Sequence, residues 1–154
     1  MSDTNYRIRE GSPTEPAVRT LIEELDAFNS ALYPAESNHF DPPEVLAAAR
    51  AIFLVVERGD ALVGCGAAKH CGDWVEIKRM FLKPEARGAG LAARMLEQLL
   101  DWARGQGVTL ARLETGHASL GALNLYRRAG FSEIPAFPPY GPDPLSIFME
   151  RALR

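Results

Sequence analysis

The segment that most constrains the fold is a strand followed by a glycine-containing turn and a helix, within residues 74–104. Trp74–Leu82 is rich in the apolar and β-branched residues typical of a strand. The turn Arg87–Gly90 follows, and apolar residues then recur at helical spacing through Gly88–Arg104. Glycines let the backbone approach a ligand closely, and a helix start offers unpaired N–H groups and the positive end of the helix dipole. The unit therefore predicts an anion site that suits a pyrophosphate, with Arg87 adding positive charge.

Two nucleotide cofactors carry a pyrophosphate, so the turn alone leaves both open. Gly88–Ala93 also matches the dinucleotide fingerprint G-x-G-x-x-A, and Glu114 lies about where a ribose-binding acid is expected. In the dinucleotide fold, however, the first glycine follows its strand almost directly, whereas Lys83–Arg87 intervene here. Too little chain also remains for a second nucleotide-binding half. A plain helix start, in which the glycines only shape a turn, is the remaining alternative.

The rest of the chain predicts one α+β domain, residues 1–154, without repeat or linker. The three strands between residues 53 and 82 are joined by tight turns, which predicts an antiparallel meander. The strand–helix–strand unit that ends at Thr115 favours a parallel pair. We expect strands at Tyr6–Glu10, Phe53–Glu57, Leu62–Lys69, Trp74–Leu82, Val108–Thr115, Phe131–Ile134 and Leu145–Ala152, and helices at Ala17–Leu32, Glu44–Ala51, Gly88–Arg104 and Leu120–Ala129.

Composition excludes several classes of partner. The net charge is -3 with both signs mixed along the chain, which gives no basic stripe for nucleic acid. No apolar run approaches the roughly 20 residues of a membrane-spanning helix, and the N-terminus lacks the pattern of a secretory signal. Cys65 and Cys71 are too few for a disulfide framework and lack the spacing of a metal site. We therefore expect a cytoplasmic protein without a bound metal.

Two motifs together make the chain resemble the GNAT superfamily of N-acetyltransferases. The superfamily signature Q/R-x-x-G-x-G/A is matched by Arg87, Gly90 and Ala92, and its late-helix pattern L-Y-x-x-x-G-F is matched by Leu125–Phe131. The resemblance extends from about Ile52 to the end of the chain. It implies a mixed, mostly antiparallel central sheet, flanked by helices, in which two parallel strands splay apart. Acetyl-CoA would lie in the V between these strands, at residues 74–82 and 108–115.

The resemblance also implies how acetyl-CoA is held. Exposed main chain on the second half of the first V strand would pair with the pantetheine arm and orient the thioester. The superfamily often has an asparagine seven residues before the tyrosine of the late helix, and Ser119 stands there in this chain. The residues expected to contact acetyl-CoA are Met80, Phe81, Leu82, Arg87, Gly88, Ala89, Gly90, Leu91, Ala92, Ser119 and Tyr126.

Two residues match catalytic positions of the superfamily. Tyr126 falls on its general acid, a phenol that protonates the departing thiolate, although a tyrosine here could also simply pack the helix against the sheet. Glu76 matches a strand glutamate that takes a proton from the attacking amine. A salt bridge from Glu76 to Lys78 or Arg79, or a solvated position at the edge of the sheet, is the structural alternative.

The acceptor is expected between the loop after the first helix and the proline-rich loop Pro135–Pro144. Candidate contacts are Tyr33, Glu36, His39, Arg79 and Tyr140. An acid such as Glu36 could receive an ammonium group, whereas Arg79 or His39 could receive a carboxylate. Aromatic, proline-rich loops are equally common as stiff turns, so these residues identify no acceptor.

The sequence thus predicts an enzyme that moves acetyl from acetyl-CoA to a primary amine of a small molecule by direct attack in a ternary complex. Two alternatives stay open: an acetyltransferase for lysine side chains or N-termini of proteins and peptides, and a non-catalytic acyl-CoA-binding module. A homodimer is common among such folds. The identity of the acceptor is outside what the sequence predicts.

Overall fold

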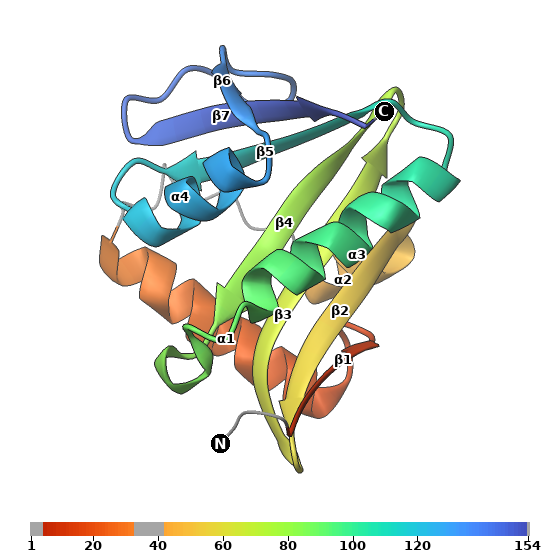
Figure 1. Ribbon diagram of the computed structural model, residues 1–154, viewed down its shortest axis with the longest axis vertical. Coiled ribbons are helices and arrows are strands. Elements are labelled where there is room, and N and C mark those ends of the chain that lie inside the picture. Colours follow the sequence, from red (N-terminus) through yellow and green to blue (C-terminus); the bar gives the residue numbers. More distant parts are fainter. Residues whose placement is uncertain (1–4, 33–41, 154) are drawn as a thin grey trace.

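The computed structural model describes residues 5–32 and 42–153, and a single sheet runs through them (Figure 1). The strands are β1 (Tyr6–Glu10), β2 (Ala51–Arg58), β3 (Ala61–Cys71), β4 (Trp74–Leu82), β5 (Leu110–Gly116), β6 (Ser132–Ile134) and β7 (Ser146–Ala152). Their order in the sheet is β1-β2-β3-β4-β5-β7-β6. The pair β4 and β5 is parallel, and every other neighbouring pair is antiparallel. The predicted α+β fold with one parallel strand pair is therefore confirmed.

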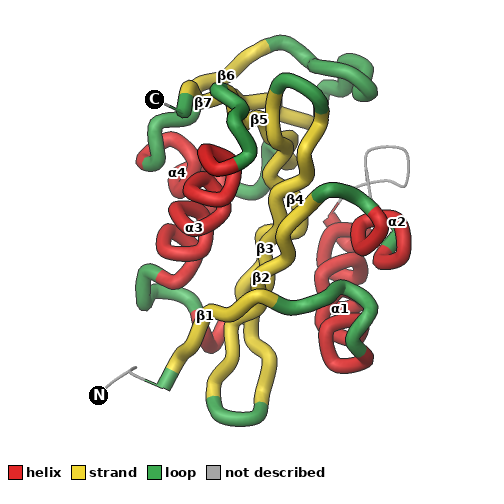
Figure 2. Tube along the Cα trace, turned by 90° about the vertical axis from the view of Figure 1, so that its right-hand side faces the viewer, coloured by secondary structure: helices red, strands yellow, loops and turns green. Residues whose placement is uncertain are grey.

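Helices cover both faces of the sheet, with α1 and α2 on one side and α3 and α4 on the other (Figure 2). Their bounds are α1 (Pro16–Leu32), α2 (Pro43–Ala48), α3 (Leu91–Gly105) and α4 (Leu120–Arg128), and a short 3-10 helix, η2, spans Pro84–Ala86. Each layer buries its own apolar cluster against the sheet, because each helix presents one apolar stripe. None of the helices in residues 5–32 and 42–153 is long and apolar enough to cross a membrane.

Two helix ends differ from the sequence prediction by three residues, and the other helix ends agree with it to within one residue. Helix α3 begins at Leu91 rather than Gly88, because Gly88 and Gly90 have φ angles of 90° and 76°. Positive φ cannot continue a right-handed helix, and glycine adopts it without the strain that a Cβ would cause. Helix α2 ends at Ala48 instead of Ala51, since Ala51 already starts β2.

The V between the parallel strands is visible in their register. Strands β4 and β5 pair from Trp74 and Leu110 to Ile77 and Leu113. Beyond that point β4 continues to Leu82 while β5 stays paired with β7, and Figure 1 shows the two strands diverging. The second half of β4 therefore has no strand at its β5 side among the described residues.

A β-bulge lies at the point where β4 leaves β5. Ala67 of β3 is opposite Lys78, and Cys65 is opposite Phe81, so β4 carries one extra residue. Arg79 lies in this bulge and has a φ angle of 60°. Gly66, between the two β3 partners, is needed because a Cβ there would lie 2.6 Å from the Met80 sulfur. The bulge thus changes which side chains of β4 face each helix layer.

Candidate active site

A cleft of about 820 Å³ opens where β4 and β5 separate. Its walls come from the second half of β4, the start of α3, the end of β5, the start and middle of α4, and the last two turns of α1. A volume of this size lies in the range of pockets that hold cofactors and small substrates. Its lining includes most of the residues that the sequence singles out.

One end of the cleft is formed by the glycine turn before α3. Arg87, Gly88, Gly90, Leu91 and Ala92 line it, whereas Ala89 lies outside the lining residues. The start of α3 thus borders the opening, and a helix start carries unpaired N–H groups and the positive end of the helix dipole. Nε of Arg87 donates a 3.0 Å hydrogen bond to the carbonyl oxygen of Leu82, which ties the turn to the end of β4. The geometry suits a bound phosphate or pyrophosphate group.

Tyr126 lines the middle of the cleft, and only 5% of it is exposed. Its ring meets that of Phe131 edge-on, with centroids 5.9 Å apart. Burial, and then the negative charge of Glu114, raise the pKa of Tyr126 well above its usual value. The phenol therefore keeps its proton throughout the neutral pH range, which a proton donor requires.

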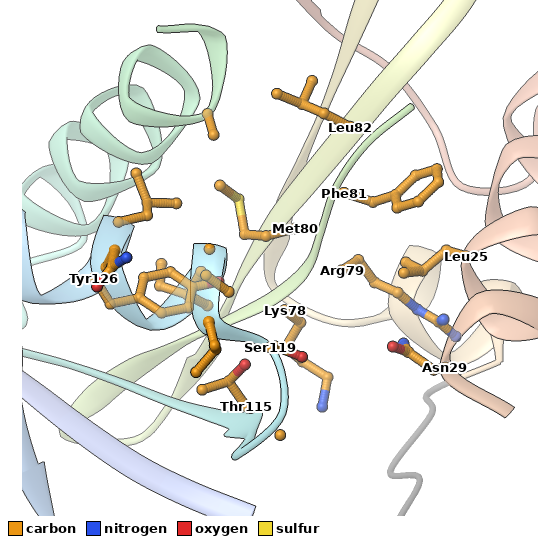
Figure 3. A pocket seen from close by; sticks show the side chains of 18 of the residues that line it. Leu25, Asn29, Lys78, Arg79, Met80, Phe81, Leu82, Thr115, Ser119 and Tyr126 are labelled. Carbon is orange, nitrogen blue, oxygen red and sulfur yellow. The ribbon is translucent and has the colours of Figure 1, made fainter. Parts of the chain in front are cut away.

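The remaining expected acetyl-CoA contacts lie along the same cleft. Met80, Phe81 and Leu82 line it from β4, and Ser119 lines it at the start of α4. In Figure 3, Met80 points toward the Tyr126 side, whereas Phe81 points toward α1. Met80 and Phe81 thus separate two compartments of the cleft, which we call the donor side, toward α3 and α4, and the acceptor side, toward α1.

Glu76 lies on the floor of the acceptor side and is buried there, with 5% of the residue exposed. Its Oε2 accepts a short hydrogen bond from the hydroxyl of Tyr140. Nζ of Lys78 lies 3.5 Å from the same oxygen and 3.2 Å from the Tyr140 hydroxyl. The side chains of Lys78 and Glu76 are 10% and 6% exposed. Of the two salt-bridge partners that the sequence offered, the structure selects Lys78.

Arg79 lies at the bulge, and its side chain points toward α1 (Figure 3). Its guanidinium forms an ion pair with Asp26 of α1, and only 4% of the side chain is exposed. The thiol of Cys65 donates a 3.1 Å hydrogen bond to the carbonyl oxygen of Arg79, which ties the bulge to β3. Arg79 still lines the cleft, but the observed ion pair holds α1 against β4.

The wall of the acceptor side comes from α1 and is mostly apolar, with Asn29 as its polar member, a feature that the sequence did not lead us to expect. Leu25, Phe28 and Leu32 line the cleft at helical spacing, and Phe28 and Leu32 remain 46% and 45% exposed. The Phe28 ring lies 6.4 Å from that of Phe81. The helical periodicity of α1 could have indicated Phe28 and Leu32, since they continue the apolar stripe of the helix beyond Leu25, the last of its buried residues.

Of the five expected acceptor contacts, Arg79 and Tyr140 line the cleft. Tyr33, Glu36 and His39 lie outside the described residues.

Residues 18–131 match the model of the acetyltransferase (GNAT) family. This match begins within α1, well before Ile52, from which the motifs indicated the resemblance. The chain is 46% identical over 151 residues to the IAA acetyltransferase of Azospirillum brasilense, across 97% of this chain and 99% of the relative.

Solved structures agree with this match. The crystal structure of a Klebsiella pneumoniae protein assigned to the acyl-CoA N-acyltransferases superposes with a TM-score of 0.81 at 35% identity, covering 97% of this chain and 98% of that one. The PaiA N-acetyltransferase of Thermoplasma acidophilum, solved in complex with coenzyme A, has a TM-score of 0.72, 20% identity and 99% coverage of both chains, a likeness of fold alone.

Proposed function

The chain belongs to the GNAT family of acetyltransferases, and we propose that it transfers acetyl from acetyl-CoA to the primary amine of a small molecule. It is an acetyl-CoA-dependent N-acetyltransferase by family; the acceptor and the residue roles are the proposal. One observation carries it: a single cleft joins the start of α3, the free edge of β4, Tyr126 and Glu76. These are the groups that acetyl transfer from a thioester to an amine needs.

On the donor side, we assign the pyrophosphate of acetyl-CoA to the main-chain N–H groups of Arg87–Ala92 and to the charge of Arg87. The pantetheine arm would lie along the edge of β4 from Met80 to Leu82, where β5 no longer pairs. Ser119 lines the opposite side of the cleft and offers a hydroxyl to the same arm. Holding the thioester at a fixed place lowers the entropic cost of the reaction.

The chemical step we propose is direct attack of the amine on the thioester carbonyl. The C–N bond forms as the C–S bond breaks, without an acyl group on the protein. Glu76 accepts the proton that the amine must lose, directly or through water, and Tyr126 donates a proton to the departing sulfur. The pKa of Tyr126 is raised by burial and by Glu114, so the phenol carries its proton at neutral pH, as a proton donor must.

A protein or peptide acceptor and a binding module without turnover remain as outcomes of the test. The buried position of Glu76 favours a small acceptor over a protein or peptide. For location and assembly, we propose the cytoplasm and a homodimer, and neither enters the chemistry.

The test is release of the coenzyme A thiol from acetyl-CoA with a panel of amines, amino acids, peptides and IAA, the compound in the name of the Azospirillum relative. Wild type should turn over a small amine. Glu76→Gln should lower the rate about 100-fold at neutral pH and recover in part at high pH, where the amine loses its proton in solution. Binding of acetyl-CoA without turnover of any compound would instead support the binding module, and turnover of peptides alone would support the protein acceptor.

A further inference from the structure

Within the described residues, Glu76 uses only one of its two carboxylate oxygens for hydrogen bonds. Oε2 accepts the bond from the Tyr140 hydroxyl, and Nζ of Lys78 lies 3.5 Å from the same oxygen. Oε1 has no such contact with these residues, and it is not one of their fully buried polar atoms. Because Glu76 lines the cleft, Oε1 is the oxygen that an acceptor amine can reach.

A chain of hydrogen bonds fixes the direction in which the Tyr140 hydroxyl donates. Nζ of Lys78 donates to the hydroxyl oxygen at 3.2 Å. An ammonium group has protons to give and no lone pair to accept one, so the hydroxyl cannot donate back to Lys78. Its proton is therefore directed to Oε2 of Glu76, the second neighbour of the hydroxyl. Tyr140 thus holds the carboxylate by one oxygen, and the charges of Lys78 and Glu76 compensate each other.

The ring of Tyr140 is itself held by aromatic rings of the loop before β7 and of β7. Its centroid lies 5.3 Å from that of Phe137, which it meets edge-on, and 5.7 Å from that of Phe148. Both phenylalanines are buried, with 3% and 5% exposed. The main-chain N–H of Tyr140 also donates a 2.9 Å hydrogen bond to the carbonyl oxygen of Phe137. A side chain packed in this way can fix the orientation of a group that it bonds.

We propose that Tyr140 is a positioning residue for Glu76, which holds Oε2 so that Oε1 faces the acceptor amine and takes its proton. The inference rests on the proposed function of the same cleft, in which Glu76 is the base. It gives Tyr140 a role through Glu76, in place of the acceptor contact that the sequence led us to expect. A carboxylate without this support rotates about its side-chain bonds, and a displacement of about 1 Å at a reacting group lowers the rate substantially.

The experiment is a double-mutant cycle of Tyr140→Phe and Glu76→Gln, measured by coenzyme A thiol release with the amine of the panel that wild type turns over fastest. Tyr140→Phe keeps the ring that packs on Phe137 and Phe148 and removes only the hydroxyl. We expect kcat to fall about tenfold, while KM for the amine stays within about twofold of wild type. In the Glu76→Gln background the same change should lower kcat by less than about twofold, because the group through which Tyr140 acts is already lost.

Tyr6→Phe is the matched control and should leave kcat unchanged, since the Tyr6 hydroxyl bonds the main chain of Glu85 outside the cleft lining. A purely structural role of Tyr140 would lower kcat by the same factor in both backgrounds, and the inference would then be wrong. It is equally wrong if Tyr140→Phe raises only KM for the amine, as loss of an acceptor contact would. If Glu76→Gln is impaired and Tyr140→Phe matches wild type, the inference fails and the proposed function stands. If Glu76→Gln turns over at the wild-type rate, the assignment of Glu76 as base fails, and this inference fails with it.

Discussion

The two faces of β4 differ in kind. Toward α3, the strand presents Val75, Ile77 and Leu82, which lie within the larger apolar cluster, and Met80, which packs against it. Toward α1 and the loop before β7 it presents the charged side chains of Glu76, Lys78 and Arg79. The bulge at Arg79 places Lys78 and Arg79, which are consecutive in the sequence, on this same face. The first face adjoins the donor side of the cleft and the second forms the acceptor side.

This contrast separates the half of the site that depends on the backbone fold from the half that depends on individual side chains of this chain. The donor side uses main-chain groups: the start of α3 and the free edge of β4. Main-chain groups depend on the fold and tolerate many sequences. The acceptor side uses side chains that meet from distant parts of the chain, as Tyr140 meets Glu76 across 64 residues. Variants on the two sides should therefore change different kinetic constants.

The largest effect we expect on the donor side comes from Tyr126→Phe. This variant keeps the ring that packs on Phe131 and removes the proton donor, so kcat should fall about 100-fold while the dissociation constant for acetyl-CoA stays unchanged. Wild type should show no fall in rate from loss of the Tyr126 proton up to about pH 10, the usual pKa of a tyrosine, because the pKa of this phenol is raised.

The control for this variant is Tyr6→Phe, which removes a hydroxyl that bonds the main chain of Glu85 outside the cleft. It should leave kcat unchanged. If Tyr126→Phe binds acetyl-CoA normally and turns over at the wild-type rate across the pH range, the assignment of Tyr126 as acid is wrong.

A smaller effect is expected at the main chain of the donor side, from Gly90→Ala. The φ angle of 76° strains any residue with a Cβ by about 1–2 kcal/mol, while no protein atom lies within 4 Å of the added methyl group. Relief of this strain would turn the N–H groups away from the phosphates, and we expect acetyl-CoA binding to weaken about tenfold. Titration calorimetry measures this directly.

The matched control is Gly105→Ala, at the other end of the same helix, where the added methyl group also meets no atom within 4 Å and φ is not positive. It should bind acetyl-CoA as wild type does. If Gly90→Ala binds acetyl-CoA as tightly as wild type, the glycine turn does not hold the phosphates. Arg87 would then be the only part of the proposed phosphate site that remains.

The local structure of the donor side can largely be predicted from the sequence, because its determinants are local. The bounds of β4 agree with the prediction, and the pattern from Arg87 to Ala92 lies within six consecutive residues. The start of α3 is wrong by three residues, since periodicity cannot distinguish a glycine at positive φ from a first helical turn.

The acceptor side is harder to predict because its contacts are long-range. The ion pair between Arg79 and Asp26 spans 53 residues, and no local pattern indicates it. The contact of Glu76 with Lys78 is the exception, since residues two apart on a strand share a face. The bulge also places Arg79 on the same face of β4 as Lys78. Strict alternation of side chains along the strand would place Arg79 on the opposite face.

The smallest effect should come from the double variant Cys65→Ala and Cys71→Ala, which tests whether the acetyl group passes through the protein. Cys65 is fully buried behind the bulge, and burial raises the pKa of its thiol to about 12, so almost no thiolate exists at neutral pH. We expect kcat to change by less than about twofold, because a thiol in this state is a poor nucleophile. Stability should fall slightly, by about 1 kcal/mol for the lost bond to the Arg79 carbonyl oxygen. A loss of turnover with the fold and acetyl-CoA binding intact would mean that the acyl group visits a cysteine. The proposal of direct attack by the amine would then be wrong, and so would the assignment of the two faces of β4 to a donor side and an acceptor side.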